Sequence, residues 1–165
     1  MELNLVLPHG LNYGTEEINN IMEQLHQLAK IAFASEFSFY LKAHQFHWNV
    51  EGMFFKQLHD LFGGVYEEVY GSIDTFAEQI RSLGSYMPGS YTRFNMLSKI
   101  EDETEILDGK QMVQELFNDN EKMKVILKKL FEASEAAGEH GFSDFVASRI
   151  DAHAKHGWML KATLK

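Results

Sequence analysis

Residues 15–50 read TEEINNIMEQLHQLAKIAFASEFSFYLKAHQFHWNV, and this stretch decides the fold. Its apolar side chains recur at steps of three and four residues, which places them on one face of a helix. They are Ile18, Ile21, Leu25, Leu28, Ala32, Phe39, Ala43, Phe46 and Val50. A second stripe beside the first comprises Phe33, Phe37, Tyr40, His44 and His47. The pattern predicts one helix over residues 16–50 that must be covered on more than one side.

Three further segments show the same period and predict three more helices. They cover residues 54–84, then a stretch from an N-cap at Asp108 to the stop at 136–138, and then a stretch from a cap at Ser143 to about Leu164. The short turns within each pair imply antiparallel neighbours, and the long connection over 85–107 is expected to hold a short helix at 94–100. The sequence therefore predicts an all-α four-helix bundle in a single domain over 1–165, with a tail over 1–15.

Composition excludes several kinds of protein. The 165 residues carry 15 Lys and Arg against 24 Asp and Glu, a net charge of −9, which argues against a purely electrostatic hold on nucleic acid or an anionic membrane. The absence of cysteine leaves His, Asp and Glu as the metal ligands. The first residues lack a basic leader region, and no apolar run approaches about 18 residues. We expect a soluble, cytoplasmic protein.

Two pairs of metal-ligating side chains lie on the first two predicted helices. His47 lies near the end of the first helix and His59 near the start of the second, so an antiparallel hairpin brings them together. Asp74 and Glu78 lie one turn apart on the second helix and share a face. Because 15 residues separate His59 from Asp74, the two pairs are about 22 Å apart along a helix that rises 1.5 Å per residue. One chain cannot bring all four to one ion.

A second copy of the chain removes this obstacle. Two hairpins packed antiparallel about a twofold axis would place the histidines of one chain against the carboxylates of the other, twice per dimer. Two imidazoles and two carboxylates suit Fe(II), Mn(II), Co(II) or Zn(II) better than Ca(II) or Mg(II). From spacing alone, core histidines and a solvated carboxylate pair stay open as the other interpretation.

Other candidates for a metal site are weaker. A di-iron site inside one bundle needs a Glu-x-x-His pair on each of two helices, and only Glu23 and His26 have that spacing, in the first turns of the first helix. His153 and His156 lie one turn apart and predict either a weak surface metal site or a solvated face. Glu36 falls on the apolar stripe, and nothing in the sequence supplies it with a partner.

Several motifs resemble one family, the Dps mini-ferritins, or DNA-binding proteins from starved cells. The resemblance covers essentially the whole chain, and the His-Trp-Asn block followed by a histidine after twelve residues is highly specific. The motifs are KAHQFHWNVEG at 42–52, LHDLF at 58–62, Asp74 with AE at 77–78, LG at 83–84, and HGWML at 156–160.

The resemblance implies a dodecameric, ferritin-like shell of four-helix bundles with a short helix between the second and third. Family members oxidise Fe(II) with hydrogen peroxide or oxygen at centres between subunits, store ferric iron inside the shell and so protect against oxidative damage. By position, His47 and His59 match the ligands of one subunit, and Asp74 and Glu78 match those of its partner. Zinc is a second metal for the same site. Trp48 matches an aromatic residue beside the centre, where it is either an electron sink or a large core residue.

Two positions depart from the family pattern. Gly63 stands where the family usually has an acidic ligand, and Gln79 stands where an Arg usually follows the glutamate. A passive metal-sequestering shell weakened by Gly63 is therefore the alternative to a ferroxidase. A DNA-condensing protein is a third hypothesis. The chain argues against it, because the first Lys or Arg is Lys30 and no basic N-terminal tail is present.

Overall fold

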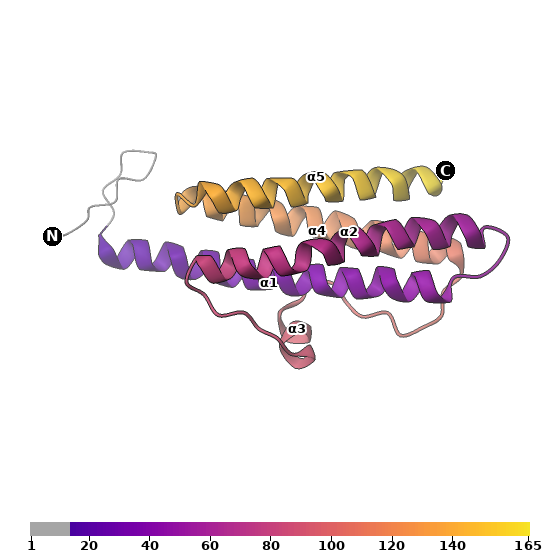
Figure 1. The fold of residues 1–165 in the computed structure, drawn as a ribbon, viewed down its shortest axis with the longest axis horizontal. Coiled ribbons are helices and arrows are strands. Elements are labelled where there is room, and N and C mark those ends of the chain that lie inside the picture. Colours follow the sequence, from indigo (N-terminus) through magenta and orange to yellow (C-terminus); the bar gives the residue numbers. More distant parts are fainter. Residues whose placement is uncertain (1–13) are drawn as a thin grey trace.

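The structure, a computed structural model, describes residues 14–165, and within that range it contains five helices and no strand. The helices are α1 (Thr15–Asn49), α2 (Phe55–Ser82), α3 (Tyr91–Leu97), α4 (Gly109–Ala136) and α5 (His140–Thr163). The predicted all-α four-helix bundle is confirmed (Figure 1). None of the helices in this range is long and apolar enough to span a bilayer. The predicted tail over 1–15 lies outside the described residues except for its last two positions.

The four long helices form two antiparallel hairpins, α1–α2 and α4–α5, that lie side by side (Figure 1). Helix α1 packs against both α2 and α4, whereas α2 and α5 make few direct contacts. The connection from α2 to α4 runs back along the bundle, so α2 and α4 point in the same direction. Fully buried aromatic rings, including Phe39, Phe46, Phe62 and Phe76, fill the centre.

Helix α3 lies outside the bundle against α1 and covers part of its second apolar stripe. The Phe94 ring lies 5.8 Å from that of Phe33 and 4.6 Å from that of Phe37 between centroids. The predicted short helix therefore exists, but it begins earlier than 94, because the Ser90 side chain accepts a hydrogen bond from the Arg93 amide and caps the first turn. The same chain thus supplies some of the cover that the stripe requires.

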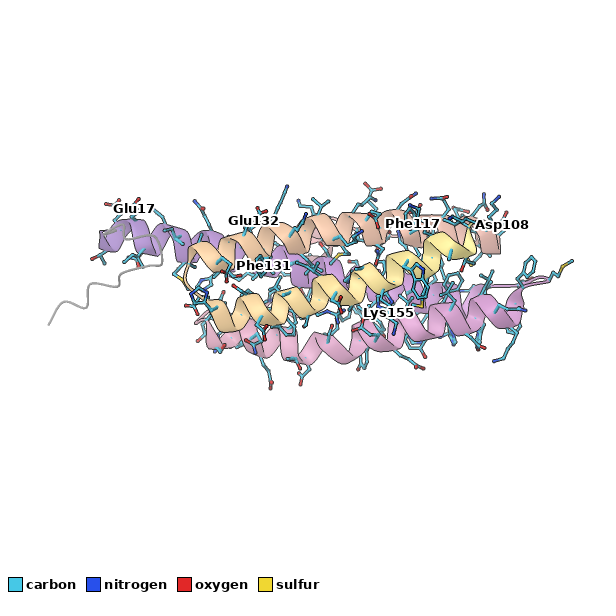
Figure 2. All side chains as sticks on the ribbon, turned by 90° about the horizontal axis from the view of Figure 1, so that it is seen from above. Glu17, Asp108, Phe117, Phe131, Glu132 and Lys155 are labelled. Atoms are coloured by element: carbon cyan, nitrogen blue, oxygen red, sulfur yellow. The ribbon has the colours of Figure 1, made fainter. Side chains whose placement is uncertain are left out.

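The helix ends follow from local chemistry. Asp108 and Gln111 form a reciprocal capping box at the start of α4, as the predicted N-cap requires, and Figure 2 shows Asp108 at the opposite end of the bundle from Glu17. Gly84 and Gly138 end α2 and α4 at φ values of 89° and 74°, a backbone region that favours glycine.

The predicted cap at Ser143 is wrong, because α5 begins at His140. The Ser143 hydroxyl donates to the Glu139 carbonyl (3.2 Å) and lies 2.7 Å from the Ser134 hydroxyl. Ser143 is therefore a buried interior residue that bonds backward along its helix and across to α4, and it is not available to cap α5.

A charged cluster crosses the interior between α1, α2 and α5, and it contradicts two predictions. Glu36 does have a partner, because the Arg149 guanidinium donates to its carboxylate from Nε (3.1 Å) and Nη2 (2.7 Å). His153 Nε2 is 2.9 Å from the other Glu36 oxygen, and His156 Nε2 is 2.8 Å from Glu68. Both histidines are buried, so neither a surface metal site nor a solvated face is correct for them.

The cluster stabilises the ionised carboxylates. Burial raises the pKa of Glu36, but His153 and Arg149 outweigh it and hold that pKa below its ordinary value. Burial likewise raises the pKa of Glu68, whereas hydrogen bonds from His156 and Arg149 lower it to about 2. The carboxylates are therefore negatively charged at neutral pH.

Removing the cap of α4 should destabilise the bundle. Asp108→Ala removes the acceptor of the Gln111 amide hydrogen bond (2.8 Å), and we expect the free energy of unfolding to fall by about 1 kcal/mol. Urea unfolding followed by circular dichroism measures the change. Asp108→Asn keeps an acceptor oxygen and should retain most of the stability; equal losses in both variants would contradict the role of the cap.

The lowered pKa of Glu68 predicts an acid dependence of stability. The group is ionised in the folded state down to a pKa of about 2 and in the unfolded state only above about 4.5, so its stabilising effect is complete above that range and disappears as pH falls from 4.5 to 2. The stability gap between the native protein and Glu68→Gln should therefore narrow on acidification. Urea unfolding between pH 7 and 3 measures the gap, with the exposed Glu132→Gln as control; a constant gap would contradict the assignment.

Candidate metal centre

His47 and His59 face each other across the α1–α2 turn. Their rings are stacked, with centroids 3.6 Å apart and planes inclined by 24°. His47 Nδ1 is 2.7 Å from the His59 carbonyl, and His59 Nδ1 is 2.8 Å from the His47 carbonyl. Because a carbonyl oxygen only accepts, each Nδ1 must carry the proton and donate. Both Nε2 atoms are then left with lone pairs, which is the arrangement found in metal-binding histidines whose other ring nitrogen donates to a carbonyl or carboxylate.

Asp74 and Glu78 lie one turn apart on α2 and are exposed. Within residues 14–165 neither carboxylate makes a hydrogen bond or ion pair. Helix α2 is continuous from Phe55 to Ser82, so it holds these carboxylates about 22 Å from His59. In the described part of the chain no group of three or more His, Asp or Glu side chains converges on a metal position. A single chain therefore presents two separate half-sites.

Comparison with known proteins places this arrangement in a family. The ferritin-like domain family matches residues 22–165. A DNA protection during starvation protein of Bacillus anthracis is 32% identical over 76% of this chain and 86% of its own length. Dps from Thermosynechococcus elongatus superposes with a TM-score of 0.87 at 26% identity, covering 90% of this chain and 94% of its own. The chain belongs to the ferritin-like Dps family. Dps from Bacillus brevis has a TM-score of 0.85 at 29% identity, covering 88% and 98% of the two chains.

Gly63, one of the two departures from the Dps pattern, lies directly under the His47 ring. A Cβ atom built on Gly63 would be 3.3 Å from His47 Nδ1 and 3.4 Å from Cε1, which is closer than ordinary van der Waals contact. The same ring is fixed by its hydrogen bond to the His59 carbonyl and by stacking, so it has little freedom to retreat. The absence of a side chain at 63 therefore removes a carboxylate and also lets the ring lie close to α2.

Asp60 and Glu67 are the acidic residues nearest to position 63 in the sequence and could replace the missing carboxylate, but both have other contacts. Asp60 accepts a hydrogen bond from Lys56 Nζ at 2.7 Å, in an exposed ion pair between residues one helical turn apart. Glu67 accepts a hydrogen bond from the Tyr66 hydroxyl at 3.4 Å. Neither is bonded to His47 or His59, although an exposed ion pair such as Lys56–Asp60 costs little to break.

Trp48 is not a core residue, because 59% of its surface is exposed. Its ring lies 4.1 Å from that of His44, and His44 in turn stacks on Tyr66 at 3.9 Å with an inclination of 14°. Tyr66 also meets the His47 ring edge-on at 5.1 Å. Partial burial lowers the pKa of His44, and repulsion from His47 when that ring is protonated lowers it further, so the neutral form of His44 is favoured. Aromatic side chains thus continue from His47 and His59 across the exposed side of the α1–α2 hairpin.

The sequence predicted that His47 and His59 would meet. It did not predict the reciprocal hydrogen bonds to backbone carbonyls or the contact of the Tyr66 ring with His47. The carbonyl bonds depend on how close the two helices lie at the turn, which residue types do not encode. Tyr66 carried a signal that was available: it lies seven residues after His59, two turns along the same face of α2.

The contact at Gly63 predicts the effect of a single methyl group. Gly63→Ala should shift the His47 ring by a few tenths of an ångström. It should weaken Co(II) binding at the proposed interface site by about tenfold or more, as mutations of groups that orient metal-binding histidines do. Equilibrium dialysis measures the affinity. Gly64→Ala is the matched control, because it raises helix propensity equally but its Cβ meets nothing within 4 Å. Equal Co(II) affinity in the two variants would contradict the prediction.

Proposed function

We propose that this protein is a Dps-type ferroxidase and iron store, which oxidises Fe(II) with hydrogen peroxide or oxygen at centres shared between two subunits. The observation that carries the proposal is the pair of stacked imidazoles whose Nδ1 atoms both donate to backbone carbonyls and whose Nε2 atoms make no hydrogen bond within residues 14–165. Membership of the ferritin-like Dps family supports the same activity.

The proposed centre forms when two chains pair antiparallel about a twofold axis along α2. In that register His59 of each chain lies opposite Asp74 of its partner, and the residues midway between them, near Tyr66 and Glu67, lie at the axis. Two equivalent centres result, each with two imidazoles from one chain and two carboxylates from the other. The exposure of Asp74 and Glu78 in the single chain supports this pairing, because it leaves them free for the partner.

Each residue of the centre has a distinct part in the reaction. His47 and His59 hold the substrate Fe(II) through Nε2, while Asp74 and Glu78 from the partner neutralise its two positive charges and favour the more highly charged product. Two Fe(II) ions, one hydrogen peroxide and two protons give two Fe(III) ions and two waters. Trp48, exposed beside His44, is the proposed store for an electron that the oxidant requires before the second Fe(II) is oxidised.

We further propose that six such dimers form a dodecameric shell in the cytoplasm that collects ferric iron and protects the cell from oxidative damage. The net charge of −9 per chain supports electrostatic attraction of Fe(II) to the shell. Asp144, exposed near the start of α5, is the proposed lining of an access pore.

One observation favours a second candidate, a shell that binds iron or zinc without turnover. Gly63 supplies no carboxylate, so a second ion beside the first has fewer ligands. Calorimetry with Zn(II) and Fe(II), combined with Fe(II) oxidation assays, separates the two candidates, because tight binding without oxidation identifies the passive shell. A DNA-condensing role has little support, since residues 1–29 contain no Lys or Arg; a gel shift at physiological salt tests it.

Complementation between two inactive chains tests the shared centre. We expect His47→Ala/His59→Ala and Asp74→Ala/Glu78→Ala each to lose Fe(II) oxidation, measured by ferric absorbance after peroxide addition. Co-assembly at equal amounts makes half of the dimers mixed, each with one intact centre of two, so about a quarter of the wild-type rate should return. Mixing the separately assembled shells without subunit exchange is the control. No recovery in co-assembled shells that contain both chains would refute the shared centre.

A further inference from the structure

The charged cluster in the bundle interior has the donor atoms of a metal site with an arginine in the middle. Glu36 from α1 and Glu68 from α2 are joined by the Arg149 guanidinium of α5, which donates to Glu36 from Nε and Nη2 and to Glu68 from Nη1 and Nη2. One further imidazole contacts each carboxylate, His153 at Glu36 and His156 at Glu68. Two carboxylate–imidazole pairs therefore lie on either side of one cation.

These donors are the type that first-row transition metals prefer. Carboxylate oxygen and imidazole nitrogen together suit Fe(II), Co(II) and Zn(II), and four-helix bundles with metal centres use Glu and His side chains that project inward from facing helices. In residues 14–165, however, no three such side chains converge on a metal position. The Arg149 guanidinium lies between the two pairs and bonds to both carboxylates.

The exposure of the side chains in the cluster decreases from the surface to the interior. The Glu68 side chain keeps 39% of its surface exposed, His156 and Arg149 are nearly buried at 4% and 5%, and Glu36 and His153 are completely buried. Helices α2 and α5 make few direct contacts, and the bonds of Arg149 and His156 to Glu68 connect them. An ion that arrives at Glu68 therefore meets Arg149 before it can reach Glu36.

One nitrogen atom in the cluster that could bind a metal, His156 Nδ1, has no hydrogen-bond partner within residues 14–165. Because Glu68 is ionised at neutral pH, with a pKa of about 2, His156 Nε2 must donate to it. His156 Nδ1 is buried and makes no hydrogen bond to the described residues. In the neutral ring it therefore carries a lone pair that accepts no hydrogen bond. A buried polar atom of this kind is costly in a structural core and available to a cation.

We propose that Arg149 is a built-in cation that occupies a metal position in the bundle core and thereby excludes iron from it. The guanidinium is always charged, bonds to both carboxylates at once and is tethered to α5, so a free divalent ion must displace a cation that cannot diffuse away. Arg149 is thus a specificity-determining residue: it confines metal binding to sites outside the bundle core. Loss of Arg149 opens a site for one divalent transition metal per chain, held by Glu36, Glu68, His153 and His156.

The test is made in a background without the interface ligands. All chains carry His47→Ala/His59→Ala, so the result does not depend on the proposed ferroxidase centre. Co(II) is added, and its visible absorption bands and its amount per chain after dialysis are measured. We expect no bound Co(II) in the background and one Co(II) per chain after adding Arg149→Ala. Adding Glu36→Gln as well should abolish the gain, and Mg(II) at equal concentration should not compete.

Arg149→Lys is the matched control, because it keeps a tethered positive charge and should not gain Co(II). The proposal is overturned if Arg149→Ala binds no more Co(II) than the background, or if the background already binds Co(II) that Glu36→Gln removes. Should Arg149→Ala fail to fold alone, refolding with Co(II) is followed by circular dichroism. Recovery of the helical signal with Co(II) but not Mg(II) supports the proposal, and failure to recover contradicts it.

Discussion

A straight helix cannot bring together two of its own residues fifteen positions apart, and the proposed metal centre of this protein depends on that constraint. Helix α2 carries His59 near its start and Asp74 and Glu78 near its end, and it runs between them without a break. Because the helix fixes the separation, the imidazoles and carboxylates meet only through a second chain. The proposed site, its stoichiometry of two per dimer and the proposed twofold pairing all follow from the length of one rigid element.

The molecule contains two sets of His and Glu or Asp donors that are treated in opposite ways. At the α1–α2 turn, both imidazoles are oriented by backbone carbonyls and keep their Nε2 atoms free. In the bundle core, His153 and His156 direct their Nε2 atoms to carboxylates that an arginine already bridges. The hydrogen-bond partners of the imidazoles therefore distinguish a donor set that is open to a metal ion from one that is closed, although both sets have similar composition.

Much of the fold was predictable from the sequence because it depends on local chemistry. The stripe over 15–50 gave α1 to within a residue or two, and Asp108 gave the start of α4. The predicted cap at Ser143 was wrong because a serine that suits a cap is also tolerated inside a helix when a carbonyl one turn back accepts a hydrogen bond from its hydroxyl. The short helix α3 was expected, but its start depends on Ser90, outside the apolar run.

The candidate site was predictable in part, for the same reason. His47 and His59 lie on either side of one short turn, so their meeting was readable from their spacing. The partner of Glu36 was not, since Arg149 is 113 residues away and comes close only through the packing of α5 against the other helices. His153 and His156 were misjudged because two histidines one turn apart look alike on a buried and on a solvated face.

A crystal soaked anaerobically in Fe(II) and measured at the iron absorption edge would test the central claim most directly. A centre shared between two chains predicts anomalous density between the histidine pair His47–His59 of one chain and the carboxylate pair Asp74–Glu78 of its partner, repeated at the twofold-related position. Iron density inside a single bundle, or none between paired chains, would contradict it.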